Sequence, residues 1–368
     1  MVQQENKTQV IINLAALAHN AELVRMHAPH SKILAVIKAD AYGHGLLAIA
    51  EALSHVDGFA VARLEEGVQL RKAGVRKTVL VLTGFTSPMD VDVFSQYELD
   101  AVVHSDYQVD YLNQSQLTQP ITVWLKINTG MNRLGVSLNA VKRVHDSLEL
   151  SAKVRLPIKL MTHLACADDM DSPATNKQVE LFDQAVEGLV GEQSITNSAG
   201  LIGWKHAQRH WVRPGIMLYG GTPFIGGNDT AGIGLQAVMT LKSTVIALRI
   251  VEKGQSVGYG GTWTAKKTSL IATIGVGYGD GYPRHAAEGT PVLINQQKAG
   301  LVGRVSMDSI NVDVSQLNTV KISDQVTLWG DGLAIEEIAE NSETISYDLM
   351  CGVTQRVPRL YRKDADGK

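Results

Sequence analysis

The chain has little cysteine and no long run of basic residues. Its 368 residues include only two cysteines, Cys166 and Cys351. Two distant cysteines do not form a disulfide framework, and this fits a reducing compartment. The net charge is −3, so nothing in the composition points to nucleic acid or a membrane surface as a partner. We therefore expect small-molecule partners.

Long apolar segments are also absent. Residues 1–10 are polar, without the apolar core of a signal peptide, and no run approaches the length of a membrane span. We therefore expect a cytoplasmic protein. The sequence has no low-complexity segment, no internal repeat, no GxxxxGK[ST] and no clean GxGxxG, which removes the best support for a nucleotide-binding site.

The apolar residues that are present predict a barrel. At 368 residues with 45% hydrophobic composition, the chain exceeds the size that one core usually fills, so two domains are expected. Short apolar segments alternate with helical stretches, and this rhythm predicts a (β/α)8 barrel, with a doubly wound open sheet as the alternative. The expected strands are 33–39, 58–62, 78–82, 101–104, 121–127, 158–163, 194–197 and 211–218.

The two ends of the chain follow other patterns. Residues 8–12 predict an isolated strand, and Asn13 is expected to cap a helix that runs to about residue 27. After about residue 235, short runs rich in Val, Ile and Thr alternate with glycine-containing turns, which predicts a mostly β domain. The predicted domains are thus a barrel, 1–235, and a C-terminal β domain, 236–368, with residues 1–12 as a candidate extra strand of the latter.

Reactive side chains stand where the expected barrel strands end, and barrel active sites lie at that end. Lys38 closes the apolar run 33–37. A desolvated lysine loses its proton easily and becomes a nucleophile, whereas a solvated lysine that merely ends a strand is the alternative. Other strand ends carry Lys126, His163, Asn197 with Ser198, and Arg213. The segment 163–169 holds His, Cys and Asp but lacks paired ligands at standard spacings, so no metal site is expected.

The segment Ala35-Val36-Ile37-Lys38-Ala39-Asp40-Ala41-Tyr42-Gly43-His44-Gly45 resembles the pyridoxal 5'-phosphate (PLP) attachment segment of alanine racemases. The resemblance covers nearly the whole chain, because further motifs follow in the family's order. They are Lys126-Ile-Asn-Thr-Gly-Met-Asn-Arg133-Leu-Gly, His163-Leu-Ala, Asn197-Ser198-Ala-Gly, Arg213-Pro-Gly-Ile-Met-Leu-Tyr-Gly, Val257-Gly-Tyr259-Gly, Gly277-Tyr278-Gly-Asp-Gly-Tyr-Pro-Arg284 and Gly303-Arg-Val-Ser-Met307-Asp308.

This resemblance implies a PLP-dependent racemase that interconverts L-alanine and D-alanine. Lys38 would bind PLP covalently and later exchange a proton on one face of the substrate α-carbon. Arg213 would face the pyridine nitrogen and, being always charged, could not accept a proton there. The cofactor phosphate would be held by the hydroxyls of Tyr42 and Ser198 and the backbone N–H groups of Gly215 and Ile216.

Racemisation by two bases needs a second group on the opposite face, and the resemblance implies Tyr259. An ordinary phenol is protonated at neutral pH, so nearby positive charge would have to favour the phenolate. The resemblance implies His163, itself held by Arg213, for that task. It also implies that Tyr259 comes from the other subunit of a homodimer with shared active sites.

The substrate carboxylate would face Arg133 and, from the partner chain, the backbone N–H of Met307. Lys126 would repel the neighbouring Arg133, and family members often carry a carbamylated lysine here. We hypothesise the same anionic modification of Lys126, which would pair with Arg133. The residues implied for the substrate entry corridor are Asp168, Tyr278, Arg284 and Arg304.

One position departs from the family. Gln355 stands where some members have a tyrosine that helps to hold the phosphate and narrows the pocket, so serine turnover beside alanine is expected. The nearest rivals are a broader amino-acid or serine racemase and a barrel-type amino-acid decarboxylase. A non-catalytic PLP-binding barrel protein would not need Tyr259 or residues 236–368, so their presence counts against it.

Overall fold

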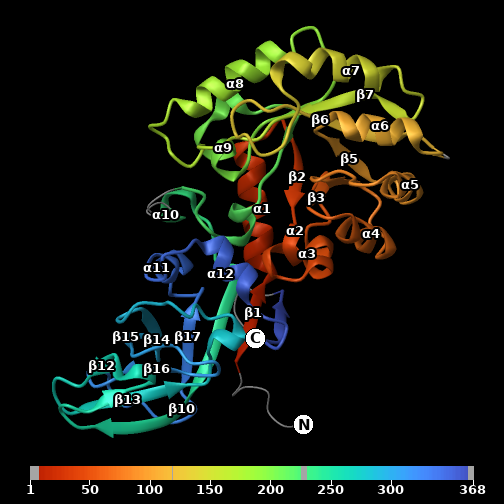
Figure 1. Ribbon diagram of the computed structural model, residues 1–368. Coiled ribbons are helices and arrows are strands. Elements are labelled where there is room, and N and C mark those ends of the chain that lie inside the picture. The colour runs from red at the N-terminus through yellow and green to blue at the C-terminus, as the bar shows by residue number, and fades with distance from the viewer. Residues whose placement is uncertain (1–7, 118, 225–229, 364–368) are drawn as a thin grey trace.

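The computed structural model describes residues 8–117, 119–224 and 230–363, which form a barrel domain and a second, mostly β domain (Figure 1). Eight parallel strands, β2 to β9, form a closed barrel in chain order, so the predicted (β/α)8 architecture is confirmed and the open sheet was wrong. The strands are β2 (Lys32–Val36), β3 (Gly58–Val61), β4 (Thr78–Val81), β5 (Asp100–Val103), β6 (Ile121–Lys126), β7 (Val154–Met161), β8 (Gln193–Ser194) and β9 (Trp211–Val212).

Helices cover the outside of the barrel. Because the barrel strands are enclosed on both faces, β3 and β5 are buried along their whole length. The helices are α1 (Leu14–His27), α2 (Lys38–Tyr42), α3 (Leu46–Ala52), α4 (Leu64–Lys72), α5 (Pro88–Gln96), α6 (Asp106–Gln114), η2 (Leu138–Ala140), α7 (Val141–Glu149), α8 (Ala174–Ala185), α9 (Ser198–Gly203), η3 (Lys205–Ala207), η4 (Ile216–Tyr219) and α10 (Thr230–Ile233).

Several barrel strands end earlier than the sequence predicts. The strand expected over 33–39 ends at Val36, and the strand expected over 211–218 ends at Val212. In both places the apolar residues continue into a tight turn, because α2 and η4 take over the chain within four residues of the strand end. An apolar run in a sequence indicates that the segment is buried but not that it is a strand. Buried turns at a barrel mouth are as apolar as buried strands, so the predicted strands were too long.

The second domain is built on one large sheet. Its order is β13-β16-β15-β14-β17-β10-β1-β18, and β10 also pairs with β13. The strands are β1 (Gln9–Asn13), β10 (Met239–Val251), β13 (Ser269–Ile274), β14 (Pro291–Ile294), β15 (Gln297–Val302), β16 (Ile310–Asp313), β17 (Gln325–Trp329) and β18 (Arg359–Arg362). Outside this sheet lie β11 (Ser256–Val257), η5 (Tyr259–Gly261), β12 (Trp263–Thr264), η6 (Tyr278–Asp280), α11 (Ile335–Glu340) and α12 (Ser346–Gly352). The sequence pattern did not predict β15, β18 or α12.

The first described strand, β1, belongs to the sheet of the second domain, and the chain crosses from it to the barrel at Asn13. β1 pairs antiparallel with β10 and parallel with β18. Asn13 Oδ1 then accepts a hydrogen bond from the backbone N–H of Ala16 at 3.0 Å, which starts α1 as predicted. Leu17, Ala21 and Val24 form the buried face of this helix. Among the described residues, no helix has the length and apolar character needed to cross a membrane.

Candidate active site

A cavity of about 540 Å³ lies at the carboxyl ends of the barrel strands, where α12 of the second domain packs beside α2. In Figure 1, α12 lies at the junction of the two domains. Residues far apart in the sequence meet in this cavity, among them most of those predicted for the site. The predicted residues that line it are Lys38, Tyr42, Lys126, Arg133, His163, Asn197, Ser198, Arg213, Gly215 and Ile216.

The cavity concentrates positive charge. Lys38, Lys126, Arg133 and Arg213 line it, and no aspartate or glutamate of the described part of the chain does. Burial, with Arg133 adding to it, lowers the pKa of Lys38. Burial and the charges of Arg213, Arg133 and Lys38 lower the pKa of Lys126 to about 8. A cavity with four cations and no carboxylate favours anionic ligands, such as a phosphate together with a carboxylate.

Arg213 is the most enclosed of these cations, at 3% exposure. Its guanidinium donates to Ser194 Oγ at 2.6 Å, to the carbonyl oxygen of Thr162 at 2.7 Å and to that of Ile195 at 3.1 Å. It also lies 3.2 Å from Nδ1 of His163. Since a guanidinium can only donate, Nδ1 accepts and the neutral imidazole carries its proton on Nε2.

Both members of this pair are shifted by their surroundings. Burial, followed by the charges of Arg213 and Lys126, holds the pKa of His163 well below its usual range. Burial lowers the pKa of Arg213 to about 10, so the guanidinium stays charged at neutral pH. The site therefore holds a neutral histidine whose orientation is fixed by a charged arginine.

One corner of the cavity is made by hydroxyls and a glycine. Ser198 Oγ accepts the backbone N–H of Gly215 at 2.8 Å. A Cβ at Gly215 would meet the hydroxyl oxygen of Tyr42 at 2.6 Å, so only glycine lets the two come this close. Asn197 caps the short α9 by accepting the N–H of Gly200 at 2.9 Å, which fixes the position of Ser198.

Lys38 is followed by a left-handed turn. Ala39, Asp40, Ala41 and Tyr42 all have φ of 53–54°. Each non-glycine residue in that region costs roughly 1–2 kcal/mol, so a run of four must be held by its surroundings. The turn brings Tyr42 back to the cavity wall, where its ring stacks on Tyr219 with centroids 4.7 Å apart.

Comparison with known proteins agrees with this architecture. The alanine racemase N-terminal domain profile matches residues 12–223, and the C-terminal domain profile matches residues 238–361. The chain belongs to the alanine racemase family. The alanine racemase of Vibrio parahaemolyticus is 46% identical over 352 residues, 96% of this chain and 98% of its own length. That of Vibrio cholerae is 46% identical over 350 residues, 95% of this chain and 97% of its own length.

Solved structures of the family share the fold. The biosynthetic alanine racemase of Pseudomonas aeruginosa matches with a TM-score of 0.94 at 40% identity, covering 97% of this chain and 99% of that one. The alanine racemase of Acinetobacter baumannii matches with a TM-score of 0.90 at 35% identity, covering 97% of this chain and 100% of that one. The barrel and the second domain are thus both family features.

Two predicted site residues lie outside this cavity of their own chain. Tyr259 is 70% exposed and Met307 is 53% exposed, and neither lines the cavity that holds Lys38. Tyr259 begins η5, between β11 and β12, and Figure 1 places β12 in the second domain away from the barrel. Gln355 is exposed and also does not line the cavity. The cavity is likewise not lined by any of the four corridor residues, Asp168, Tyr278, Arg284 and Arg304.

Sequence reasoning missed the residues that hold the Lys38 segment. Glu66 Oε1 accepts the N–H of Ala39 at 2.7 Å, while Oε2 accepts the N–H groups of Ala62 and Arg63. Arg359 Nε donates to the carbonyl oxygen of Gly43 at 2.7 Å. A glutamate at the third position of a helix predicts only a local cap, so nothing in the sequence pointed from Glu66 to the residue after Lys38.

Other missed residues come from the second domain or lie behind the turn. Tyr347 and Cys351 of α12 line the cavity, and burial, aided by Asp168, raises the pKa of Tyr347 to about 12. Tyr361 of β18 donates to the carbonyl oxygen of His44 at 3.0 Å. Tyr219 donates to the carbonyl oxygen of Val36 at 3.1 Å. Each of these residues makes its contact across the domain junction or across the barrel. Local sequence patterns do not predict contacts between residues so far apart in the chain.

We expect Glu66→Gln to disturb the Lys38 segment. The amide has one acceptor oxygen in place of two, so at least one of the N–H groups that now bind the carboxylate loses its acceptor, and hydrogen bonds to charged groups are worth about 1.5–3 kcal/mol. The carboxylate also raises the pKa of Lys38, so its removal lowers that pKa. The pH midpoint at which Lys38 reacts with an added aldehyde, PLP, should move to lower pH, with enzyme activity falling at least about tenfold.

Glu65→Gln is the matched control, since Glu65 is exposed in the same helical turn and no hydrogen bond or ion pair of its carboxylate to a described residue is found. Equal pH midpoints and equal activities for Glu66→Gln and Glu65→Gln would contradict the role assigned to Glu66.

Proposed function

We propose that this protein interconverts L-alanine and D-alanine with PLP as its cofactor. The proposal is carried by one observation: Lys38, with a lowered pKa, shares a carboxylate-free cavity with Arg213, Arg133 and Lys126. Such a cavity suits a phosphate-bearing aldehyde and an amino-acid carboxylate together. Membership of the alanine racemase family supports the same substrate. The free thiols of Cys166 and Cys351 fit a cytoplasmic location.

The residues of the cavity fit PLP. The hydroxyls of Tyr42 and Ser198 stand beside Gly215, whose missing Cβ leaves room for close approach of an anion to the backbone. With Ile216, these groups would hold the phosphate. Lys38 would bind the aldehyde carbon through its amine. When bound, PLP withdraws electrons from the substrate and so stabilises negative charge at the α-carbon.

Arg213 would lie against the pyridine nitrogen. Because its guanidinium is charged at neutral pH and has no acceptor atom, it cannot take up a proton from that nitrogen. Three protein acceptors already fix it in place. Arg213 therefore supplies a fixed positive charge and a fixed donor, which favours an unprotonated nitrogen and prompt return of the proton to the α-carbon.

Two groups on opposite faces of the α-carbon would move the proton. Lys38 serves one face, since its lowered pKa increases the share of neutral amine that can accept a proton. Tyr259 serves the other, supplied by the second subunit of a homodimer. Its exposure, and its absence from the Lys38 cavity of its own chain, support this division between two chains.

His163 would orient the phenol of Tyr259 by a hydrogen bond from Nε2. Since His163 is neutral, the positive charge behind this hydrogen bond belongs to Arg213, which lies 3.2 Å from Nδ1 of the imidazole. The family resemblance places the positive charge beside Tyr259 on His163. In the structure His163 is neutral, and the charge is that of Arg213 behind it. Replacing Arg213 should therefore affect both the cofactor and the tyrosine.

Arg133 and the backbone N–H of Met307 from the partner subunit would bind the substrate carboxylate. No hydrogen bond or ion pair of the Arg133 guanidinium to a described residue is found, so its donors are available. Lys126 lies in the same cavity at 7% exposure. We propose that its neutral amine adds carbon dioxide, releasing one proton and leaving a carbamate anion that pairs with Arg133.

The pKa of Lys126, lowered to about 8 by burial and by neighbouring cations, leaves about a tenth of the amine neutral at pH 7. Labelled bicarbonate should therefore give a carbamate signal in the carbon NMR spectrum that strengthens as pH rises from 6 to 8. Lys126→Met should lose the signal and raise KM for alanine about tenfold, as expected for one charge-assisted hydrogen bond. An unlabelled Lys126 under saturating bicarbonate would contradict the modification.

The function is tested by a panel of L-amino acids supplied to the purified PLP-loaded protein. We expect alanine to be converted to its D-form fastest and serine measurably, since glutamine stands at position 355 where some family members have a tyrosine that narrows the pocket. A broader racemase would convert larger side chains at comparable rates, and a decarboxylase would release carbon dioxide with loss of the amino acid. Lys38→Ala is the control that abolishes turnover. Failure to interconvert any member of the panel would overturn the proposal.

A further inference from the structure

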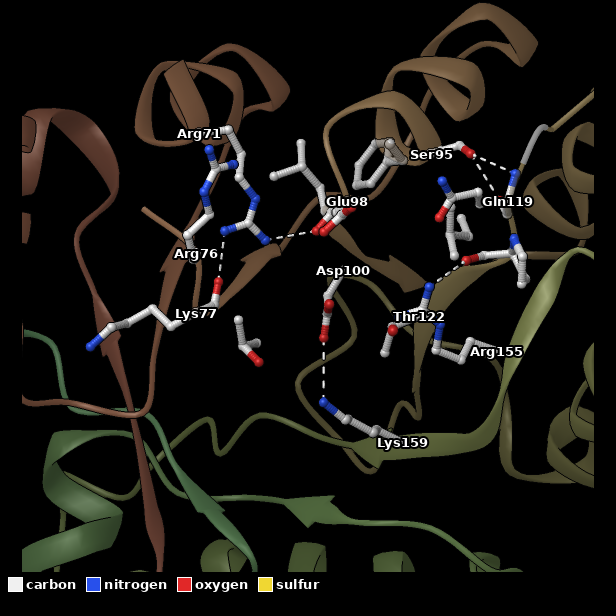
Figure 2. Close-up of a pocket in the computed structure, with 15 residues that line it drawn as sticks. Arg71, Arg76, Lys77, Ser95, Glu98, Asp100, Gln119, Thr122, Arg155 and Lys159 are labelled. Atoms are coloured by element: carbon white, nitrogen blue, oxygen red, sulfur yellow. Dashed lines mark hydrogen bonds and ion pairs between the residues drawn. The ribbon is translucent and has the colours of Figure 1, made fainter. Parts of the chain in front are cut away.

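A second cavity, of about 200 Å³, lies on the opposite side of the barrel from the site above. It is formed by the end of α4, the α4–β4 and α5–β5 loops, and the beginnings of β5, β6 and β7 (Figure 2). The amino ends of barrel strands normally serve stability and carry no active site. The side chains gathered here are unusually charged for such a place.

Four cationic groups surround this cavity. In Figure 2, Arg71 and Arg76 lie on one side, Arg155 on the other, and Lys159 below them. Two carboxylates, Glu98 and Asp100, also line it, which leaves two positive charges in excess. Lys77 contributes backbone only, since its ammonium turns away to the carbonyl oxygens of Ser54 and Val56. The whole chain has a net charge of −3, so this excess is local.

The floor of the cavity is a satisfied ion pair. Asp100 accepts the indole N–H of Trp124 at 2.8 Å and lies 3.4 Å from Lys159 Nζ. Lys159 also approaches Glu192 at 3.9 Å and sits over the rings of Trp124 and Trp211 at 4.7 Å and 5.1 Å. The charge of Asp100 also acts on Arg71, but among the described residues its only ion pair within 4.0 Å is with Lys159.

The arginines have no such partner. Arg71 donates to four backbone carbonyl oxygens at 2.7–2.9 Å, which fixes the guanidinium but leaves its charge unpaired by any carboxylate within 4.0 Å among the described residues. Arg155 makes one long contact, 3.4 Å to the carbonyl oxygen of Pro120. For Arg76, no hydrogen bond or ion pair to a described residue is found. Three guanidiniums thus line one cavity, and two of them, Arg76 and Arg155, have most of their N–H donors available, whereas Arg71 has used four of its five.

We propose that this cavity binds a small dianion of the phosphate type. Guanidinium groups recognise phosphate through paired N–H donors, and two excess charges match a dianion. The cavity is large enough for such an ion, since a water molecule occupies about 30 Å³, but too small for a nucleotide or a polymer. Bound there, the ion would join the α4–β4 loop to β7 through Arg76 and Arg155, which come from segments far apart in the chain, beside the fixed charge of Arg71.

The test uses the PLP-loaded protein, in which the phosphate position of the other cavity is already filled. Inorganic phosphate is titrated calorimetrically in a zwitterionic buffer at constant ionic strength, with chloride as the balancing anion. We expect saturable binding of one phosphate per chain and displacement by sulfate. The variant Arg76→Gln/Arg155→Gln should bind at least tenfold more weakly, with its racemase activity unchanged. Arg143→Gln, an exposed arginine on α7, should bind as the wild type does.

Other outcomes decide against the site or identify its ligand. Equal phosphate affinity in the double variant, or heat that never saturates, would overturn the proposal. If glycerol 3-phosphate binds at least as tightly as inorganic phosphate, the occupant is a phosphorylated metabolite and not the free ion; weaker binding of the ester identifies the free ion. Because racemisation is measured separately on the same samples, a failure here is distinguishable from a failure of the proposed activity.

Discussion

The structure depends on how the segment after Lys38 is held. Four successive residues, Ala39 to Tyr42, adopt a left-handed conformation that only glycine tolerates cheaply. Glu66 from α4 and Arg359 from β18 bind the backbone on either side of this turn. The barrel therefore holds this turn at Ala39, next to Lys38, and the second domain holds it at Gly43. This constraint explains why the short strand β18 must reach the barrel mouth.

Electrostatics give the active cavity its selectivity. Four cations and no carboxylate line it, and the cost of burying them appears in the lowered pKa values of Lys38 and Lys126. Each lowered value, caused first by burial, increases the share of reactive neutral amine. The same arrangement keeps His163 neutral, again through burial and Arg213. An anion that enters this cavity therefore reduces the repulsion among these buried cations, which the folded chain otherwise has to tolerate.

Much of the architecture could be predicted from the sequence because it rests on periodic burial. The eight barrel strands, the cap at Asn13 and the β-rich second domain all follow from apolar spacing and turn residues. Strand ends could not be predicted well, since the buried turn after Val36 looks like strand in composition. The left-handed run at Ala39–Tyr42 could not be predicted from the sequence, because the segment contains no glycine to indicate positive φ.

The candidate site divides in the same way. Motif residues such as Lys38, Arg213 and Ser198 could be named from the sequence, and the structure gathers them in one cavity. Residues that act through the backbone, such as Glu66 and Tyr361, could not be named, because their partners are distant in sequence. The cation cluster opposite was equally hidden, since Arg71 and Arg155 come from separate segments with no common motif.

We propose that each active site combines Lys38 of one chain with Tyr259 of another, and mixed subunits test this arrangement. Lys38→Ala and Tyr259→Phe are assayed alone and after co-expression with different affinity tags. Alone, each should lose nearly all racemisation. Random pairing should restore about a quarter of wild-type activity, because half of the dimers then carry one intact site. No recovery above the separate variants, or full activity of Tyr259→Phe alone, would contradict the claim.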